Sequence, residues 1–193
     1  GKRHEMTSLS YDVTNYKDYL DYYARLIGKP IYDFDKDPDK PFINAAQFKK
    51  IVSLLRTKKN IILEGAPGVG KTFLARKIAY QLIGELKDEN IEMVQFHQSY
   101  SYEDFVQGIR PSEEGGFERK NGIFFDFCSK ARRSPDQQFV FIIDEINRGN
   151  ISKILGELMM LIEADKRKKQ YAIKLTYSNE DDERFFVPEN VYL

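Results

Sequence analysis

A glycine-rich segment with a lysine and a threonine stands between a short apolar run and a stretch of helical spacing. The segment is GAPGVGKT, residues 65–72. Its glycines let the backbone turn tightly and point its N–H groups inward, at a helix N-terminus whose dipole favours negative charge. The pattern Gly-x-x-x-x-Gly-Lys-[Ser/Thr] between a strand and a helix predicts a loop that holds the phosphates of a nucleotide. The expected binding residues are Gly65, Ala66, Pro67, Gly68, Val69, Gly70, Lys71, Thr72 and Phe73.

Hydrolysis of such a nucleotide needs a metal ion and a group that activates water. We expect Lys71 to reach the β and γ phosphates and the Thr72 hydroxyl to bind Mg²⁺. The apolar run FVFIIDE, residues 139–145, supplies acids at the end of a buried strand. Asp144 is the second expected Mg²⁺ ligand, because parallel sheets gather their ligands at the carboxyl ends of the strands. Glu145 is the expected catalytic residue that polarises water, and a helix-capping acid is the alternative.

These side chains must be positioned by alternating helices and strands. Helical spacing is predicted after Asn44, after the phosphate loop as far as Gly84, at 101–105, at 124–131, and as one long helix over 151–162. Strands are predicted at 61–63, 91–96 and 139–144, as a pair within 171–187, and from residue 191. A surface hairpin is predicted around EEGGFERKNG, residues 113–122. This order predicts an α/β fold, a parallel sheet flanked by helices with β-hairpin insertions.

The first part of the chain differs from the rest. Apolar residues recur at helical spacing over 16–27, and the stretch YDFDKDPDKP, residues 32–41, has the composition of a solvated acidic linker. We therefore predict an N-terminal helix and linker over 1–41 and a nucleotide-binding core over 42–193.

Composition removes several classes of protein. Lys+Arg and Asp+Glu both total 30 in 193 residues, so no overall charge draws the chain to nucleic acid or to membranes. Cys128 is the only cysteine, which excludes an internal disulfide and favours a buried, inert thiol. No apolar stretch approaches the roughly 20 residues that span a bilayer. We expect a cytoplasmic protein and, because it lacks an initiating Met and ends as a strand begins, a fragment.

Several longer segments resemble one family. GAPGVGKTFLARKIAYQL, QFHQSYSYEDF, DEINR and LTYSNEDDERFFVPENVY are together similar to the AAA+ core of McrB-type GTPase motor subunits of McrBC modification-dependent restriction systems. The resemblance covers the chain from about residue 42 onward. It implies a P-loop NTPase that prefers GTP, forms a ring of its own copies, partners a McrC-type endonuclease and acts on DNA through that complex.

The resemblance also assigns roles. It places the phosphate loop on residues 65–72, the Mg²⁺ acid on Asp144 and the catalytic acid on Glu145. Asn147 and Arg148 would support the attacking water, the subunit interface or the local structure, and we name Asn147 with Glu145 and Lys71 as catalytic. The methylated-DNA reader that precedes the motor in this family is not among these residues. The interface arginines and the small helical lid would lie beyond Leu193.

Two other functions stay open at this stage. One is an ATP-dependent remodelling factor of the MoxR or dynein-related kind, which also carries DEIN. The other is a nucleotide-controlled assembly module in which hydrolysis is incidental. His97, Tyr100 and Tyr102 are interpreted as packing or loop residues.

Overall fold

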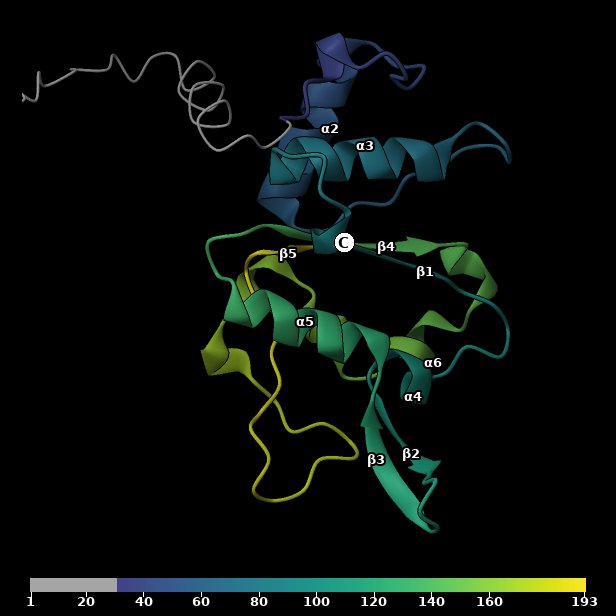
Figure 1. Cartoon of the computed structure of the whole chain (residues 1–193), viewed down its shortest axis with the longest axis vertical. Coiled ribbons are helices and arrows are strands. Elements are labelled where there is room, and N and C mark those ends of the chain that lie inside the picture. Colours follow the sequence, from purple (N-terminus) through teal and green to yellow (C-terminus); the bar gives the residue numbers. More distant parts are fainter. Residues whose placement is uncertain (1–30) are drawn as a thin grey trace, which may run out of the picture. The chain divides into compact units, whose positions relative to one another are not determined.

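A three-stranded parallel sheet carries the strand that ends in Asp144. In the computed structural model, which describes residues 31–193, β1 (Ile91–Gln95), β4 (Phe139–Asp144) and β5 (Val191–Tyr192) pair in the order β1-β4-β5 (Figure 1). Both pairings are parallel, and Gln95 lies opposite Asp144. The predicted parallel sheet is therefore confirmed. The predicted helix over 16–27 lies outside the described residues.

The strand predicted at 61–63 is not formed. Backbone pairing joins this segment to the end of β5, because Ile61 N donates to Leu193 O at 3.1 Å and Leu193 N donates to Lys59 O at 3.0 Å. Both hydrogen bonds involve the single residue Leu193, and one paired residue is too few to make a strand. Ile62 is 78% exposed. The segment still runs beside the sheet and leads directly into the phosphate loop.

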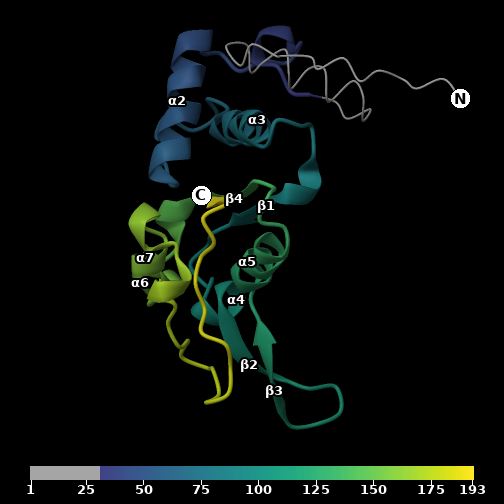
Figure 2. The same ribbon diagram turned by 90° about the vertical axis from the view of Figure 1, so that its left-hand side faces the viewer.

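Helices cover both faces of the sheet. On one face lie α2 (Ala45–Lys58) and α3 (Lys71–Ile83), and on the other lies α5 (Ile123–Arg133), as Figure 2 shows. Val140 and Ile142 pack with the first pair, whereas Phe139 and Phe141 pack on the α5 side. This alternation confirms that β4 is buried on both faces. The helix predicted after Asn44 begins with a capping box of Asn44 and Gln47, and the predicted end of the next helix at Gly84 is also present.

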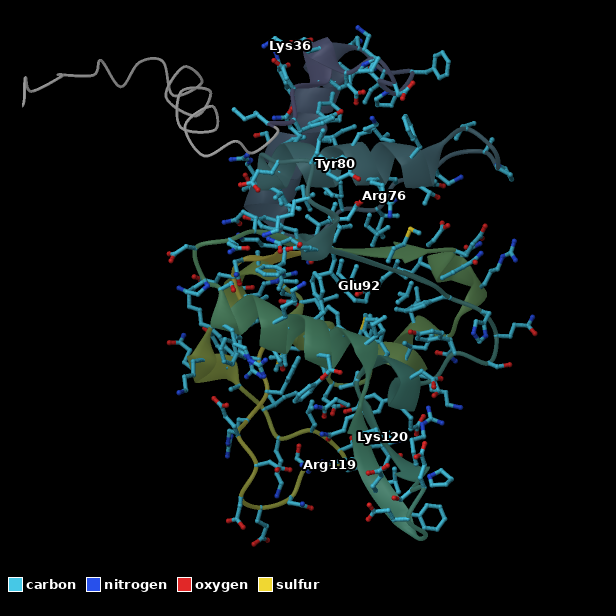
Figure 3. All side chains as sticks on the ribbon, in the orientation of Figure 1. Lys36, Arg76, Tyr80, Glu92, Arg119 and Lys120 are labelled. Atoms are coloured by element: carbon cyan, nitrogen blue, oxygen red, sulfur yellow. The ribbon has the colours of Figure 1, made fainter. Side chains whose placement is uncertain are left out.

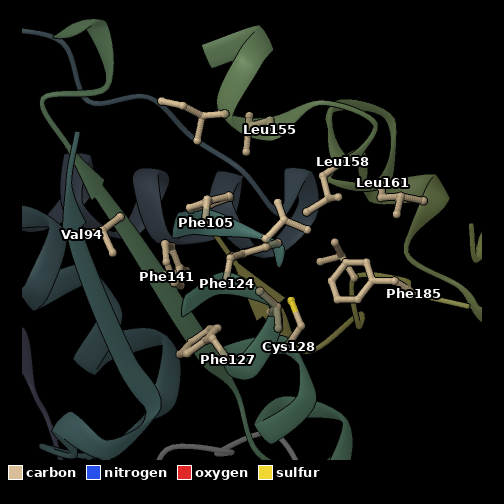
Figure 4. Packing of buried hydrophobic residues seen from close by; sticks show 14 of the residues in the cluster. Val94, Phe105, Phe124, Phe127, Cys128, Phe141, Leu155, Leu158, Leu161 and Phe185 are labelled. Atoms are coloured by element: carbon tan, nitrogen blue, oxygen red, sulfur yellow. The ribbon is translucent and has the colours of Figure 1, made fainter. Parts of the chain in front are cut away.

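An aromatic cluster fills the α5 side of the sheet (Figure 4). The ring of Phe105, from the short helix α4 (Tyr102–Phe105), stacks on Phe124 with centroids 4.9 Å apart. Phe141 meets both rings edge-on, at 5.6 and 5.0 Å. Cys128 is fully buried in the same cluster, as expected, and burial raises the pKa of its thiol.

Truncation within this cluster should cost much of the stability. We expect Phe124→Ala to lower the free energy of unfolding by about 3–5 kcal/mol, since the variant loses buried apolar surface and leaves a cavity. Urea unfolding followed by circular dichroism measures the change. Phe117→Ala is the matched control, because Phe117 is 79% exposed and its loss should change stability by less than about 0.5 kcal/mol. Equal losses in the two variants would contradict the assignment of the core.

The predicted hairpin is confirmed. It consists of β2 (Gln107–Pro111) and β3 (Phe117–Asn121), paired antiparallel. Gly115 and Gly116 turn the chain between them with φ of 92° and 83°, values that favour glycine. Arg119 on β3 forms an ion pair with Asp182 and donates to Tyr177 O at 3.2 Å (Figure 3). The hairpin is thus fastened to a later loop of the chain.

The long helix predicted over 151–162 is wrong. The structure has two short helices, α6 (Ile151–Leu155) and α7 (Leu158–Leu161), separated at Gly156, whose φ is 50°. The carboxylate of Glu157 accepts hydrogen bonds from Tyr102 Oη at 2.7 Å and Thr176 N at 3.2 Å. These contacts hold Glu157 beside Tyr102 and Thr176, a position that is not compatible with a continuous helix. The apolar residues 154, 155, 158 and 161 are buried all the same.

The strand pair predicted within 171–187 is also wrong. Only an isolated antiparallel bridge joins Ile173 and Phe185. Beyond it Thr176 N donates to Glu157, and Ser178 N donates to Leu175 O at 3.0 Å in a turn, so the backbone donors that would extend a ladder are used elsewhere. Two 3-10 turns precede this region, η5 (Ala164–Lys166) and η6 (Lys169–Tyr171).

Residues 32–37 pack against the helices and are not a solvated linker. Phe34, in the 3-10 turn η2 (Phe34–Lys36), stacks on Phe48 of α2 at 4.2 Å. Asp37 accepts a hydrogen bond from Tyr32 Oη at 2.8 Å and pairs with Lys77 of α3 at 2.6 Å. Burial alone would raise the pKa of Asp37, but the bonds from Lys77 and Tyr32 outweigh it and hold that pKa below its ordinary value. The domain boundary between residues 41 and 42 stays a prediction.

Candidate functional site

The glycine-rich loop enters α3 with the conformation that its glycines allow. Gly68 and Gly70 have φ of 77° and 80°, in the left-handed region, where a side chain would cost about 1–2 kcal/mol. Gly70 is the N-cap of α3, and its carbonyl accepts from Leu74 N at 2.9 Å. Residues 64–70 are exposed. The loop therefore presents the start of a helix, with its unpaired N–H groups, to any anion in solution.

Lys71 lies over its own loop. Its Nζ donates to Gly65 O at 2.8 Å and to Ala66 O at 2.9 Å. These acceptors are neutral carbonyls, and hydrogen bonds between an ammonium and a charged phosphate oxygen are stronger. The ammonium is thus held within the loop in a position from which it can exchange carbonyls for phosphate.

Thr72 and Asp144 meet although they are 72 residues apart in sequence. Thr72 Oγ1 donates to Asp144 Oδ2 at 3.2 Å, and Asp144 Oδ1 accepts from Glu145 N at 3.0 Å. A hydroxyl and a carboxylate are oxygen ligands of the kind that Mg²⁺ prefers. Within residues 31–193 there is no group of three or more His, Cys, Asp or Glu side chains that could hold a metal ion. The two oxygens therefore fit Mg²⁺ that keeps waters and shares phosphate oxygens, its usual mode.

Glu145 turns the chain sharply as β4 ends. Its φ and ψ are 51° and 41°, a left-handed conformation that is uncommon outside glycine and that costs about 1–2 kcal/mol. Arg148 N donates to Glu145 O at 2.8 Å and closes this turn. The Glu145 side chain makes no capping hydrogen bond to the 3-10 turn η4 (Ile146–Arg148) that follows. Glu145 thus occupies the N-cap position of this turn without a side-chain cap, and its catalytic role stays a prediction.

The carboxylate of Glu145 has a cationic partner. Arg148 Nε lies 3.0 Å from Glu145 Oε2, and both side chains remain partly exposed. Sequence analysis named Arg148 only as a support for water, an interface or the local structure and missed this ion pair, although the spacing of three residues was a signal for it. Asn147, the third residue named as catalytic, is exposed on η4. Phe73 is half-exposed on α3, with Lys77 Nζ 5.0 Å from its ring centroid.

The three aromatic loop residues after β1 make packing contacts. His97 meets the ring of Tyr100 edge-on at 5.4 Å, and Tyr100 lies 4.9 Å from Phe96. Tyr102 is buried and donates to Glu157. These contacts agree with the interpretation of the three residues as packing residues. No helix within the described part of the chain is long and apolar enough to cross a membrane.

Comparison with known proteins agrees with this geometry. The family model of the AAA domain (dynein-related subfamily) matches residues 60–189. The chain is 57% identical over 152 residues to the type IV methyl-directed restriction enzyme EcoKMcrB subunit of Escherichia coli K12, a match that covers 79% of this chain and 33% of the relative. It is 28% identical over 144 residues to the type II restriction enzyme BsuMI component YdiS of Bacillus subtilis 168, covering 59% of this chain and 40% of the relative.

Proposed function

We propose that this chain, which belongs to the dynein-related subfamily of AAA domains, binds and hydrolyses a nucleoside triphosphate, preferably GTP, as the motor of a McrBC-like restriction complex. The hydrogen bond between Thr72 and Asp144 carries the proposal, because it joins the end of the phosphate loop to the acid that ends β4. Both relatives are components of restriction enzymes. The chain spans about a third of the length of the first, so the activity and partners of a whole protein are part of this proposal.

Different residues of the proposed site bind the phosphates, hold the metal ion and activate water. Backbone N–H groups of residues 65–70 and the ammonium of Lys71 bind the phosphates, and Thr72 with Asp144 holds Mg²⁺. When bound, Mg²⁺ neutralises charge that develops on the phosphate oxygens. The Glu145 carboxylate orients the attacking water and accepts its proton. Glu145 directly follows the expected metal ligand Asp144, and its backbone N–H donates to the Asp144 carboxylate.

The partners follow from the relatives and from the resemblance. We propose that the whole protein that contains this AAA domain forms a ring of its own copies, that the ring binds a McrC-type endonuclease subunit, and that DNA is acted on through the assembled complex. The base is chosen outside the phosphate loop, which contacts no base atoms. We assign that choice to the segment before Asn44, where the Phe42 side chain is fully exposed.

A nucleotide panel tests the function. We expect Mg²⁺-dependent phosphate release from GTP to exceed release from ATP, with and without a McrC-type partner. Lys71→Ala should weaken GTP binding roughly 10- to 100-fold, as the loss of a hydrogen bond to a charged group predicts. Lys49→Ala, an exposed lysine on α2, is the control and should bind as the wild type does.

Three outcomes would change the proposal. Equal displacement of labelled GTP by ATP would remove the base preference, and faster release from ATP would favour a MoxR-like remodelling factor. Nucleotide-dependent assembly without phosphate release would favour an assembly module. Unchanged GTP binding by Lys71→Ala would contradict the site itself.

A further inference from the structure

A pocket lies at the opposite end of the sheet from the phosphate loop. Its volume is about 580 Å³, and Gln138 and Asn190, which directly precede β4 and β5, are among the residues that line it. Asp144 is at the other end of β4, about 17 Å away at the usual rise of a strand. In Figure 1 β5 lies on the left, toward the end of α5, and β4 runs from the centre to the right. The pocket is therefore separate from the candidate nucleotide site.

The pocket is strongly cationic in a chain with no net charge. It is lined by five basic side chains and a single acidic one, Glu189. The basic residues are Lys59, Arg132, Arg167, Lys168 and Lys169. They come from four places in the fold: the end of α2, the last turn of α5, the turn between η5 and η6, and η6 itself. The tertiary fold brings these basic side chains together, because they do not all belong to one helix.

None of these five cations is ion-paired within residues 31–193. Elsewhere in the same part of the chain basic side chains do form ion pairs with carboxylates, such as Lys77 with Asp37 and Arg119 with Asp182. Lys59 Nζ contacts Tyr192, through its hydroxyl at 3.0 Å and over its ring at 4.2 Å. Arg132 donates to Ser129 Oγ at 3.1 Å. Glu189 is thus the single acidic side chain that lines the pocket with these five cations, and it forms an ion pair with none of them in the described part of the chain.

Arg167 adds a buried charge beneath the pocket. It is 1% exposed, and it donates to Ile162 O at 2.9 Å, to Val191 O and to the side-chain oxygen of Asn60. All three acceptors are neutral. Burial lowers the pKa of Arg167 to about 10, so the guanidinium is still charged at neutral pH. Its hydrogen bonds fasten β5, and its charge adds to the field in the pocket.

One wall of the pocket is aromatic. The Arg132 guanidinium lies 5.4 Å from the centroid of Phe186 and 5.9 Å from that of Phe185. Phe186 and Tyr192 both line the pocket, and Phe186 is only partly buried. Cations beside aromatic faces are the combination that binds single-stranded nucleic acid, where phosphates meet the cations and bases stack on rings or guanidinium planes. An acidic peptide would use the charges but has no need of the flat wall.

We propose that this pocket binds the phosphates of a nucleic-acid strand, with a base against the wall formed by Phe186 and Arg132. Basic residues also stabilise the C-terminal end of a helix, which is an alternative explanation of the cluster. It applies only to Arg132, because the other four cations do not belong to α5. The proposal is independent of nucleotide hydrolysis. Lys168 and Lys169 are the exposed members that can reach phosphate without disturbing the fold.

The test is binding of a fluorescein-labelled single strand about 20 nucleotides long, followed by anisotropy over a range of salt concentrations. The double variant Lys168→Ala/Lys169→Ala should bind about tenfold more weakly at low salt. It should also reduce the slope of log K against log salt by about 1.4, the value for two phosphate contacts on a single strand. Lys49→Ala/Lys50→Ala, with the same change in net charge on the exposed face of α2, should bind as the wild type does.

Further measurements test whether the pocket and the nucleotide site are independent, and whether the pocket prefers a nucleic-acid strand to other polyanions. Lys71→Ala should bind the strand normally, and Lys168→Ala/Lys169→Ala should bind Mg²⁺-GTP normally, because the sites lie at opposite ends of the sheet. Equal losses in the two double-lysine variants would show general attraction and overturn the proposal. Polyglutamate that displaces the strand as well as an unlabelled strand does would also overturn it, in favour of an acidic protein partner.

Discussion

Glu145→Gln is expected to bind Mg²⁺-GTP as tightly as the wild type and to lower kcat by about 10²- to 10⁴-fold, the contribution of a positioned general base. The amide keeps the shape of the side chain but cannot take a proton from water. The metal ligands Thr72 and Asp144 are untouched, so phosphate and metal binding remain. Equilibrium binding of a fluorescent GTP analogue and phosphate release under saturating GTP separate the two quantities.

Matched variants make the result specific. Asp144→Ala should weaken Mg²⁺-dependent binding as well as turnover, because it removes the partner of Thr72. Glu113→Gln, an exposed acid in the turn of the hairpin, should change neither. Wild-type turnover by Glu145→Gln would mean that Glu145 is not the base, and that its strained turn has no part in activating water.

The parts of the site that follow from local rules could be predicted from sequence. The loop over 65–72 needs glycines at particular positions, and Gly68 and Gly70 have the positive φ that accounts for them. The run over 139–144 is too apolar to lie anywhere but inside a sheet, so its terminal Asp144 had to emerge at the carboxyl edge. Parallel pairing then brings Asp144 to Thr72, a contact that the sequence predicts without any knowledge of distance.

Other features depend on contacts between distant residues, and periodicity does not show them. The spacing over 151–162 is helical on both sides of Gly156, yet Glu157 is held by Tyr102 and Thr176, and the helix breaks. The charges around Asp37 indicate a linker, yet Lys77 neutralises that carboxylate and Phe34 packs on Phe48. The ion pair of Glu145 with Arg148 had a signal in its spacing, but the left-handed turn that accompanies it did not.

The cationic pocket shows the same limit for charge. Equal totals of acidic and basic residues predict no attraction to nucleic acid. The fold pairs several of the cations with acids, as the ion pairs of Lys77 and Arg119 show, but the five cations of the pocket form no ion pair in the part of the chain that the structure describes. Local charge therefore depends on which ion pairs the fold makes, and composition does not contain that information.

Turnover per subunit is expected to rise with protein concentration, by up to about 10³- to 10⁵-fold between the isolated and the assembled state, the effect of an arginine supplied to the transition state. Within residues 31–193 the cation that contacts the phosphate loop is Lys71. Thr72, the next residue, donates a hydrogen bond to Asp144. Arg148, the arginine next to the catalytic acid, is paired with Glu145. We therefore propose that an arginine of a neighbouring copy supplies the positive charge that stabilises the transition state, as the family resemblance implies.

A mixing experiment tests this supply in trans more directly than dilution does. A chain extended beyond Leu193 should hydrolyse GTP slowly when dilute, and an excess of its Glu145→Gln variant should accelerate it, because inactive subunits still offer their arginines. Light scattering on the same mixtures reports assembly, and the 193-residue chain measured alone is the control. A fast rate from the 193-residue chain that does not depend on concentration would show that its site is self-sufficient. Unchanged turnover in assembled mixtures would likewise remove the neighbouring subunit from the mechanism, because the added surfaces would then be present without effect.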